Sequence, residues 1–301
     1  GLRIHPSASI GVAICPRDGL QGEQLISRAD TALYHAKNSG RNRYSIFELG
    51  MDQELRRRQM LEADMADAIE QNQFELYFQP RLDLASTSIS GYEALIRWNH
   101  PSKGLVSPAD FIPVAENSGK IIAIGNWVME TACRMAAEKL GEGTISVNVS
   151  PRQFAEKGFV ETLELLLDNT GLAPERLEIE ITESILIEDD RLAVAILNRL
   201  KALGVRVALD DFGTGYSSLA YLSRFPFDTI KIDRSFVENL KNEEDAVAIV
   251  DTIIRLGRAL DMRLVAEGVE EVTELEILAA RGCHEIQGYL LGRPAPFEHL
   301  Q

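Results

Sequence analysis

From about residue 74 onward, short runs rich in β-branched and aromatic residues alternate with stretches whose apolar residues recur every three or four positions. Helical spacing of this kind is clear in Phe159–Leu167, Leu192–Leu203 and Ala246–Leu260. The alternation favours a parallel sheet with crossover helices, and eight strands in roughly 230 residues predict an α/β fold, a TIM-like (β/α)8 barrel. The candidate strands are Phe74–Gln79, Tyr92–Trp98, Thr144–Val149, Leu177–Thr182, Val205–Asp211, Thr229–Asp233, Arg263–Gly268 and Glu285–Leu290.

The connection between the first two strands departs from this rhythm. It runs only from Pro80 to Gly91 and is rich in serine and threonine. A parallel crossover normally needs a dozen or more residues, usually with a helix. We therefore predict a hairpin, with the first strand antiparallel to the second.

The segment before the barrel predicts a small α/β remnant and a connector. Residues 1–47 contain a predicted strand Ser9–Cys15, a helix Gly22–Asn38 and a strand Arg43–Phe47, which is too little to fold alone. Residues 48–72 predict a connecting helix with its apolar residues near one face. Whether this helix caps the barrel or passes a signal stays open.

Composition narrows the classes of partner. The chain has 301 residues, a formal net charge of -15 and a sequence pI of about 4.9. An acidic surface repels DNA and RNA polymers, whereas a small anionic substrate can bind if metal ions supply positive charge locally.

Cysteine usage and hydropathy bear on location. Cys15, Cys133 and Cys283 are far apart and form no C-x-x-C pair, which argues against a disulfide framework or a zinc site and fits a reducing cytoplasm. No apolar run approaches the ~18 residues of a membrane span, so we expect no membrane contact by this segment. A chain beginning at Gly1 is typical of a piece of a longer parent, which can carry membrane segments upstream.

Polar residues gather at the predicted strand ends. In a barrel the carboxyl ends of the strands converge on one rim, where function concentrates. A single strand glutamate is more often a solvated face or a salt-bridge partner, but several together in apolar runs are costly unless paired or bound to metal. The set comprises Glu93, Asn148, Glu180, Asp210, Asp211, Lys231, Asp233, Glu267 and Gln287.

The chemistry of this set favours hard cations. An all-oxygen cluster suits Mg2+ or Mn2+ better than zinc, and the adjacent Asp210 and Asp211 suggest a bridging carboxylate and two metal ions. Lys231 could orient or polarise the attacking water, and Glu267 could be a metal ligand or the base. Arg97 fits a phosphate or a structural salt bridge equally well. The segment 213–218 could be a mobile loop over the site or a turn before a helix.

Several ordered motifs resemble the EAL family and cover about residues 60–297. They are Tyr77-Phe78-Gln79-Pro80, Glu93-Ala94-Leu95-Ile96-Arg97-Trp98, Asn148-Val149-Ser150, Glu180-Ile181-Thr182-Glu183-Ser184, Asp210-Asp211-Phe212-Gly213-Thr214-Gly215-Tyr216-Ser217-Ser218-Leu219, Lys231-Ile232-Asp233, Ala266-Glu267-Gly268-Val269-Glu270, and Gln287-Gly288-Tyr289 with Arg293-Pro294.

The resemblance implies a barrel with an antiparallel first strand that hydrolyses cyclic di-GMP to linear pGpG with two Mg2+ or Mn2+ ions, acting as a homodimer through this domain. It implies four catalytic residues, namely Lys231, Glu267, Glu93 and Asp210, of which Lys231 positions the water. It also implies that Glu183 anchors the loop after Asp211. The implied metal ligands are Glu93, Asn148, Glu180, Asp210, Asp211 and Glu267, and the implied substrate-binding residues are Gln79, Arg97, Asp233 and Gln287.

None of these positions is substituted, which favours an active phosphodiesterase over a catalytically silent cyclic di-GMP receptor. A barrel enzyme acting on another phosphodiester or an enolisable substrate is disfavoured by the paired aspartates. Arg81, after Gln79-Pro80, departs from the family pattern but falls outside the expected metal ligands.

The start of the chain resembles the end of a GGDEF diguanylate cyclase domain. The resemblance rests on Ser9–Ala13, Arg28–Lys37 and Gly40–Tyr44, and the Gly-Gly-Asp/Glu-Glu-Phe signature is absent from the sequence. We therefore expect no synthesis of cyclic di-GMP, and a tandem GGDEF–EAL parent. The predicted domains are a GGDEF-like fragment at 1–47, a connecting helix at 48–72 and the phosphodiesterase barrel at 60–301.

Overall fold

The computed structural model describes residues 7–38, 40, 42–213, 222, 224–241 and 244–300. The chain divides into two compact units, Gly1–Asp67 and Ala68–Gln301. The division falls inside the connector predicted at 48–72.

The N-terminal unit contains two strands and two helices. Its elements are β1 (Ile10–Val12), α1 (Gly22–Asn38), β2 (Tyr44–Ile46) and α2 (Leu49–Asp64), and β1 pairs with β2 in parallel. Ala32, Ala36 and Phe47 are buried within this unit, whereas Ile10 and Tyr44 remain exposed.

The prediction of one helix over 48–72 was wrong in its extent. Helix α2 ends at Asp64, and the following residues form turns. The backbone of Asn72 adopts a left-handed conformation with φ of 52°, and the Gln73 amide donates to the Ala68 carbonyl at 2.9 Å. A left-handed residue cannot continue an α-helix, so the predicted helix cannot run through Asn72.

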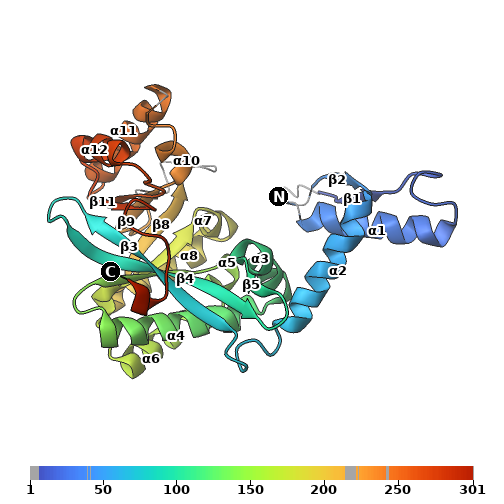
Figure 1. Ribbon diagram of the computed structural model, residues 1–301, viewed down its shortest axis with the longest axis horizontal. Coiled ribbons are helices and arrows are strands. Elements are labelled where there is room, and N and C mark those ends of the chain that lie inside the picture. The colour runs from blue at the N-terminus through green and yellow to red at the C-terminus, as the bar shows by residue number, and fades with distance from the viewer. Residues whose placement is uncertain are drawn as a thin grey trace, which may run out of the picture. The chain divides into compact units, whose positions relative to one another are not determined.

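The larger unit is a closed barrel, as predicted, and every predicted strand is present (Figure 1). The ring runs in the order β3-β11-β10-β9-β8-β7-β6-β4 and closes through β3–β4 pairing. One further strand, β5 (Gly104–Val106), pairs antiparallel with the end of β4 and was not predicted, since it has only three residues. The barrel strands are β3 (Phe74–Asp83), β4 (Ser88–His100), β6 (Thr144–Asn148), β7 (Leu177–Thr182), β8 (Arg206–Phe212), β9 (Thr229–Ile232), β10 (Arg263–Ala266) and β11 (Glu285–Gln287).

The first barrel strand is antiparallel to both of its neighbours, which confirms the hairpin prediction. Strand β3 pairs with β4 in a register that places Phe78 opposite Ala94, and with β11 so that Leu82 faces Ile286. The Asp83 carboxylate closes the turn by accepting a hydrogen bond from the Ser86 amide at 2.8 Å.

Helices surround the strands of this unit (Figure 1). They are α3 (Pro108–Ser118), α4 (Ile121–Lys139), α5 (Pro151–Phe154), α6 (Phe159–Thr170), α7 (Ser184–Glu188), α8 (Asp190–Leu203), α10 (Arg234–Val237), α11 (Glu244–Ala259) and α12 (Val272–Arg281), with the short 3-10 helices η1 (Pro174–Arg176) and η2 (Phe297–His299). No helix among the described residues is long and apolar enough to cross a membrane.

Alternation along the strands separates two environments. Ile145, Ile179 and Ile230 are fully buried, and their strand neighbours Ser146 and Glu178 are buried polar residues on the opposite face. The apolar face packs against helices, where each buried side chain contributes roughly 1.5–3 kcal/mol. The opposite face turns polar side chains into the barrel, and this interior leads up to the candidate site.

Candidate active site

The carboxyl ends of the barrel strands enclose a polar cavity of about 240 Å³. Because each strand contributes one inward side chain at this level, residues far apart in sequence converge there. Seven of the predicted residues line the cavity: Gln79, Glu93, Asn148, Asp210, Lys231, Glu267 and Gln287.

Lys231 is the centre of this cluster. It lies on β9 with 1% of its surface exposed. Its Nζ is 2.6 Å from Glu180 Oε2 and 2.6 Å from Glu267 Oε1. The same atom is 3.2 Å from Asp210 Oδ1 and 3.8 Å from Glu93 Oε2. One ammonium group therefore faces four carboxylates from different strands and strand ends.

Amide side chains fix the orientation of Glu93. Asn148 Nδ2 donates to Glu93 Oε1 at 2.6 Å, and Gln287 Nε2 donates to Glu93 Oε2 at 2.5 Å. Gln287 Nε2 also donates to Gln79 Oε1 at 3.0 Å. These contacts hold Glu93 with both oxygens engaged at the floor of the cavity.

A distortion of β8 places the two adjacent aspartates. The ladder between β8 and β9 shifts register between Leu209 and Phe212, and Asp211 adopts a positive φ of 54°. Such irregularities re-aim side chains near functional sites, and aspartate tolerates the left-handed region. Asp210 thereby reaches Lys231, while Asp211 is exposed at the rim.

Because carboxylates outnumber cationic side chains in this cluster, the pKa values of its members are shifted. Burial, together with Glu93 and Asp210, raises the pKa of Glu180 well above its usual range despite Lys231. Burial and the same two neighbours raise the pKa of Glu267 to about 7. Burial opposes the charge of Lys231, but the surrounding carboxylates raise its pKa.

The described residues fit a hard divalent cation at this position. One carboxylate oxygen from each of Asp210, Asp211 and Glu267 lies within 4.8 Å of the others. In addition, Glu180 Oε1 is buried without a hydrogen-bond partner, which is costly for a carboxylate. A cation with oxygen preference would relieve the excess of negative charge in this cluster.

Arg97 lies in a separate, mainly apolar recess beside the cavity. The recess has a volume of about 470 Å³ and shares Asn148 with the acidic cavity. Its walls come from β4, α3, α4 and β6 and include Ile112 and Ile124. The Arg97 guanidinium lies 5.1 Å from the centre of the Tyr77 ring. The recess was not predicted, because its walls are apolar residues that sequence alone assigns to packing.

Three further predictions concern the rim. Glu183 Oε1 accepts a hydrogen bond from the Gly213 amide at 3.4 Å, next to the predicted loop. The rest of that loop, 214–218, lies outside the described residues. Asp233 follows β9 and accepts hydrogen bonds from the Ser235 amide at 3.0 Å and hydroxyl at 2.5 Å, so it caps α10. Its substrate-binding role stays a prediction.

A polar layer inside the barrel was missed by the sequence analysis. Arg81 and Glu178 are both 3% exposed and form a buried ion pair. Glu178 also accepts hydrogen bonds from Ser146 at 2.8 Å and from Thr229 at 2.7 Å. Burial opposes its charge, but Arg81 and these hydroxyls lower the pKa of Glu178 to about 2. The period of two in Leu177–Glu180 was the available signal, since it turns Glu178 and Glu180 to the same face.

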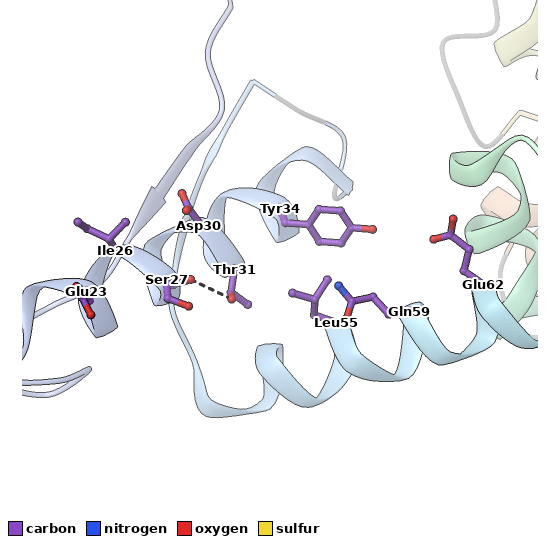
Figure 2. A pocket seen from close by; sticks show the side chains of 9 residues that line it. All are labelled: Glu23, Ile26, Ser27, Asp30, Thr31, Tyr34, Leu55, Gln59 and Glu62. Atoms are coloured by element: carbon purple, nitrogen blue, oxygen red, sulfur yellow. Dashed lines mark hydrogen bonds between the residues drawn. The ribbon is translucent and has the colours of Figure 1, made fainter.

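The N-terminal unit has a cavity of its own, about 700 Å³, between α1 and α2 (Figure 2). Tyr34 points from α1 toward Leu55 and Gln59 of α2, and Glu23 and Asp30 line the same groove (Figure 2). None of its described residues belongs to the potential metal-binding group.

The fold and the site together define an α/β barrel with a cluster of carboxylates at the carboxyl ends of its strands. Residues 62–294 match the EAL domain, and residues 1–43 match the diguanylate cyclase GGDEF domain. The chain belongs to the EAL domain family, and a GGDEF fragment precedes its EAL domain. Divalent metal use is typical of that family, in agreement with the acidic cluster.

Curated relatives align over nearly the whole chain. An uncharacterized signaling protein of Caulobacter vibrioides is 48% identical over 100% of this chain and 37% of its own length. The bifunctional diguanylate cyclase/cyclic di-GMP phosphodiesterase MucR of Pseudomonas aeruginosa is 44% identical over 99% of this chain and 44% of its own length. The chain thus spans less than half the length of these relatives.

Solved structures resemble the barrel closely. The PaMucR phosphodiesterase in complex with c-di-GMP has a TM-score of 0.77 and 43% identity, and the match covers 80% of this chain and 100% of that one. The EAL enzyme Bd1971, bound to cAMP and cyclic di-GMP, has a TM-score of 0.78 and 34% identity, covering 93% of this chain and 75% of that one.

Proposed function

We propose that this chain is a phosphodiesterase that hydrolyses cyclic di-GMP to linear pGpG with two Mg2+ or Mn2+ ions. The observation that carries the proposal is the convergence of four carboxylates on the buried Lys231 beside the group formed by Asp210, Asp211 and Glu267. The relative MucR, named as a bifunctional diguanylate cyclase/cyclic di-GMP phosphodiesterase, and the c-di-GMP complex of PaMucR support the choice of substrate.

The oxygen-rich residues of the rim would hold the metal ions. We assign this role to Glu93, Asn148, Glu180, Asp210, Asp211 and Glu267, of which Asn148 and Asp211 are exposed and so accessible from the rim. Bound divalent ions would lower the pKa of an attacking water and neutralise charge on the phosphodiester.

The remaining work falls to the protein's own side chains. Lys231, donating to Glu180 at 2.6 Å, would position the water and balance charge beside it. Glu267, whose pKa is raised to about 7 by burial and neighbouring carboxylates, is suited to accept the water proton near neutral pH. The water oxygen would bond to phosphorus on one side, and the bond between phosphorus and the 3′ oxygen would break on the other. The released 3′ oxygen would be protonated, and the ring would open.

The apolar recess beside the site would take a base of the substrate. It adjoins Asn148, and the half-buried Arg97 on its wall is suited to a phosphate oxygen. Gln79 and Gln287, which line the cavity, and Asp233, which follows β9, would complete substrate binding. Glu183 would anchor the loop through its contact with Gly213.

Two expectations about the whole protein remain part of the proposal. The barrel would form a homodimer, and the enzyme would act in the cytoplasm. The fragment at 1–47 would be non-catalytic, with the connector at 48–72 and the phosphodiesterase at 60–301.

The test is incubation of the purified chain with cyclic di-GMP and Mg2+ or Mn2+, with products separated by chromatography. Linear pGpG should appear, and a chelator should abolish it. Intact cyclic di-GMP, with binding detected separately by calorimetry, would instead favour the receptor.

A further inference from the structure

A continuous polar layer lies directly below the candidate site inside the barrel. Arg81 is its hub. Its Nη1 donates to Glu178 Oε1, its Nη2 donates to Thr144 Oγ1 at 2.9 Å, and its Nε lies 3.6 Å from Glu285 Oε2. Glu178 in turn accepts hydrogen bonds from the hydroxyls of Ser146 and Thr229. This layer, defined as Arg81, Thr144, Ser146, Glu178, Thr229 and Glu285, joins strands β3, β6, β7, β9 and β11.

The layer and the site are built on the same strands, two residues apart. Glu178 precedes Glu180 on β7, Thr229 precedes Lys231 on β9, and Arg81 follows Gln79 on the antiparallel β3. The same offset relates Ser146 to Asn148 on β6 and Glu285 to Gln287 on β11. Since strand side chains alternate, each of these five site residues stands above a member of the layer.

Directional hydrogen bonds constrain the spacing between neighbouring strands more tightly than apolar contacts do. Charge-assisted bonds such as those of Arg81 fix both distance and angle, whereas apolar side chains fill space in several arrangements. Replacing a buried ion pair with neutral side chains is often neutral for stability. Stability alone therefore does not account for charges at this depth.

Arg81 also reaches the site itself. Its Nη1 lies 4.0 Å from Glu180 Oε1, the buried oxygen without a hydrogen-bond partner. Glu180 thus stands between Lys231 on one oxygen and Arg81 on the side of the other.

We propose that Arg81, through its pair with Glu178, is a positioning residue that fixes the spacing of the metal-binding and catalytic side chains one level above it. The inference rests on the proposed hydrolase function for its kinetic readout. It goes beyond that function because no residue of the layer needs to touch substrate, water or metal.

The test is the neutral double variant R81M/E178Q, which removes both charges of the pair. The new amide keeps an oxygen acceptor for one of the Ser146 and Thr229 hydroxyls, and its nitrogen can donate to the other. We expect its melting temperature to stay within a few degrees of wild type. Its Kd for Mn2+, measured by calorimetry, should rise at least tenfold. Its kcat at saturating Mn2+ should fall at least tenfold, with KM changed less than threefold, because the layer does not contact substrate.

Two further variants make the outcome decisive. R81K keeps the charge but loses the fork that joins Glu178 to Thr144, so its Mn2+ affinity and kcat should lie between those of wild type and R81M/E178Q. R281M/D251N removes an ion pair of 2.9 Å between α12 and α11 and should leave both quantities unchanged.

The inference is overturned if folded R81M/E178Q binds Mn2+ and turns over substrate within twofold of wild type. If the double variant does not fold, the R81K variant decides: a Mn2+ affinity and a kcat equal to those of wild type in R81K would overturn the inference. A wild-type chain that binds Mn2+ but leaves cyclic di-GMP intact would refute the proposed function alone, since the Mn2+ affinities still compare the variants.

Discussion

At the scale of single residues, the site combines one buried cation with an excess of acids. Lys231 is the group on which Glu93, Glu180, Asp210 and Glu267 converge, and burial strengthens each interaction. The local chemistry depends on this balance more than on any single carboxylate.

Replacing Lys231 with methionine should therefore remove both the charge balance and the proposed water-positioning group. We expect kcat to fall by at least ~100-fold, measured as release of linear pGpG at saturating Mn2+, in protein shown to be folded by circular dichroism. Lys139→Met is the control, because Lys139 is exposed and forms an ion pair with the exposed Glu298. A kcat within threefold of wild type would remove Lys231 from the mechanism.

Arg97 offers a second test at this scale. As a phosphate-binding group, Arg97→Met should raise KM for cyclic di-GMP by ~10–100-fold, the equivalent of a lost charged hydrogen bond, with kcat little changed. Steady-state kinetics of Arg97→Met and of Arg199→Met, which removes a surface ion pair with Glu161, give the comparison. An unchanged KM would mean that Arg97 acts structurally, stacked on Tyr77.

The sequence anticipated the site residues because strand ends can be recognised locally and converge by topology. It did not anticipate the pair Arg81–Glu178. Arg81 follows a proline in a strand that turned out to be antiparallel, so its level in the barrel depends on register with β4 and β11, which no local pattern encodes. The roles assigned to the individual residues remain predictions.

At the scale of elements, long strands and helices followed the hydrophobic period closely. The predicted strand Leu177–Thr182 and helix Gly22–Asn38 match the structure residue for residue. The short strand β5 exists only through pairing with β4, and helix α2 ends early at Asp64, so both depend on surroundings that a sequence window does not contain.

The recess between α3, α4, β4 and β6 is a feature of elements, and its proposed role is testable. Ile112→Phe adds three carbons to the wall, so it should narrow the recess and raise KM for cyclic di-GMP at least roughly tenfold, since one extra carbon in a shaped pocket is already worth that much. Hydrolysis of bis(p-nitrophenyl) phosphate, which lacks a guanine base, should change little.

Leu165→Phe on the exposed surface of α6 is the matched control for this substitution. Equal effects of Ile112→Phe on both substrates would indicate damage to the site itself. No effect on either would place the base elsewhere.

At the scale of the whole molecule, the chain carries a net negative charge, and the cavity of its barrel is lined by carboxylates. The net charge of -15 and the clustered carboxylates make the barrel a better host for divalent cations than for free polyanions. The two units, Gly1–Asp67 and Ala68–Gln301, carry separate family matches, and the metal-binding group lies in the second.

Metal binding should accordingly stabilise the barrel unit. At a Mn2+ concentration of a hundred times Kd, linkage predicts a gain of about 2.7 kcal/mol in the free energy of unfolding. Thermal melts with Mn2+ and with chelator should show the gain in wild type and its loss in Asp210→Asn. Equal shifts in both proteins would mean that Mn2+ binds outside the proposed site.

The central claim is that the acidic cluster at the barrel rim hydrolyses cyclic di-GMP, and one time course tests it most directly. Wild type, Glu93→Gln and the surface control Glu161→Gln are incubated with cyclic di-GMP and Mn2+, and linear pGpG is quantified. We predict chelator-sensitive product from wild type and Glu161→Gln, and a rate lower by at least ~100-fold in folded Glu93→Gln. Product formation at the wild-type rate by Glu93→Gln, or none from wild type, would contradict the account.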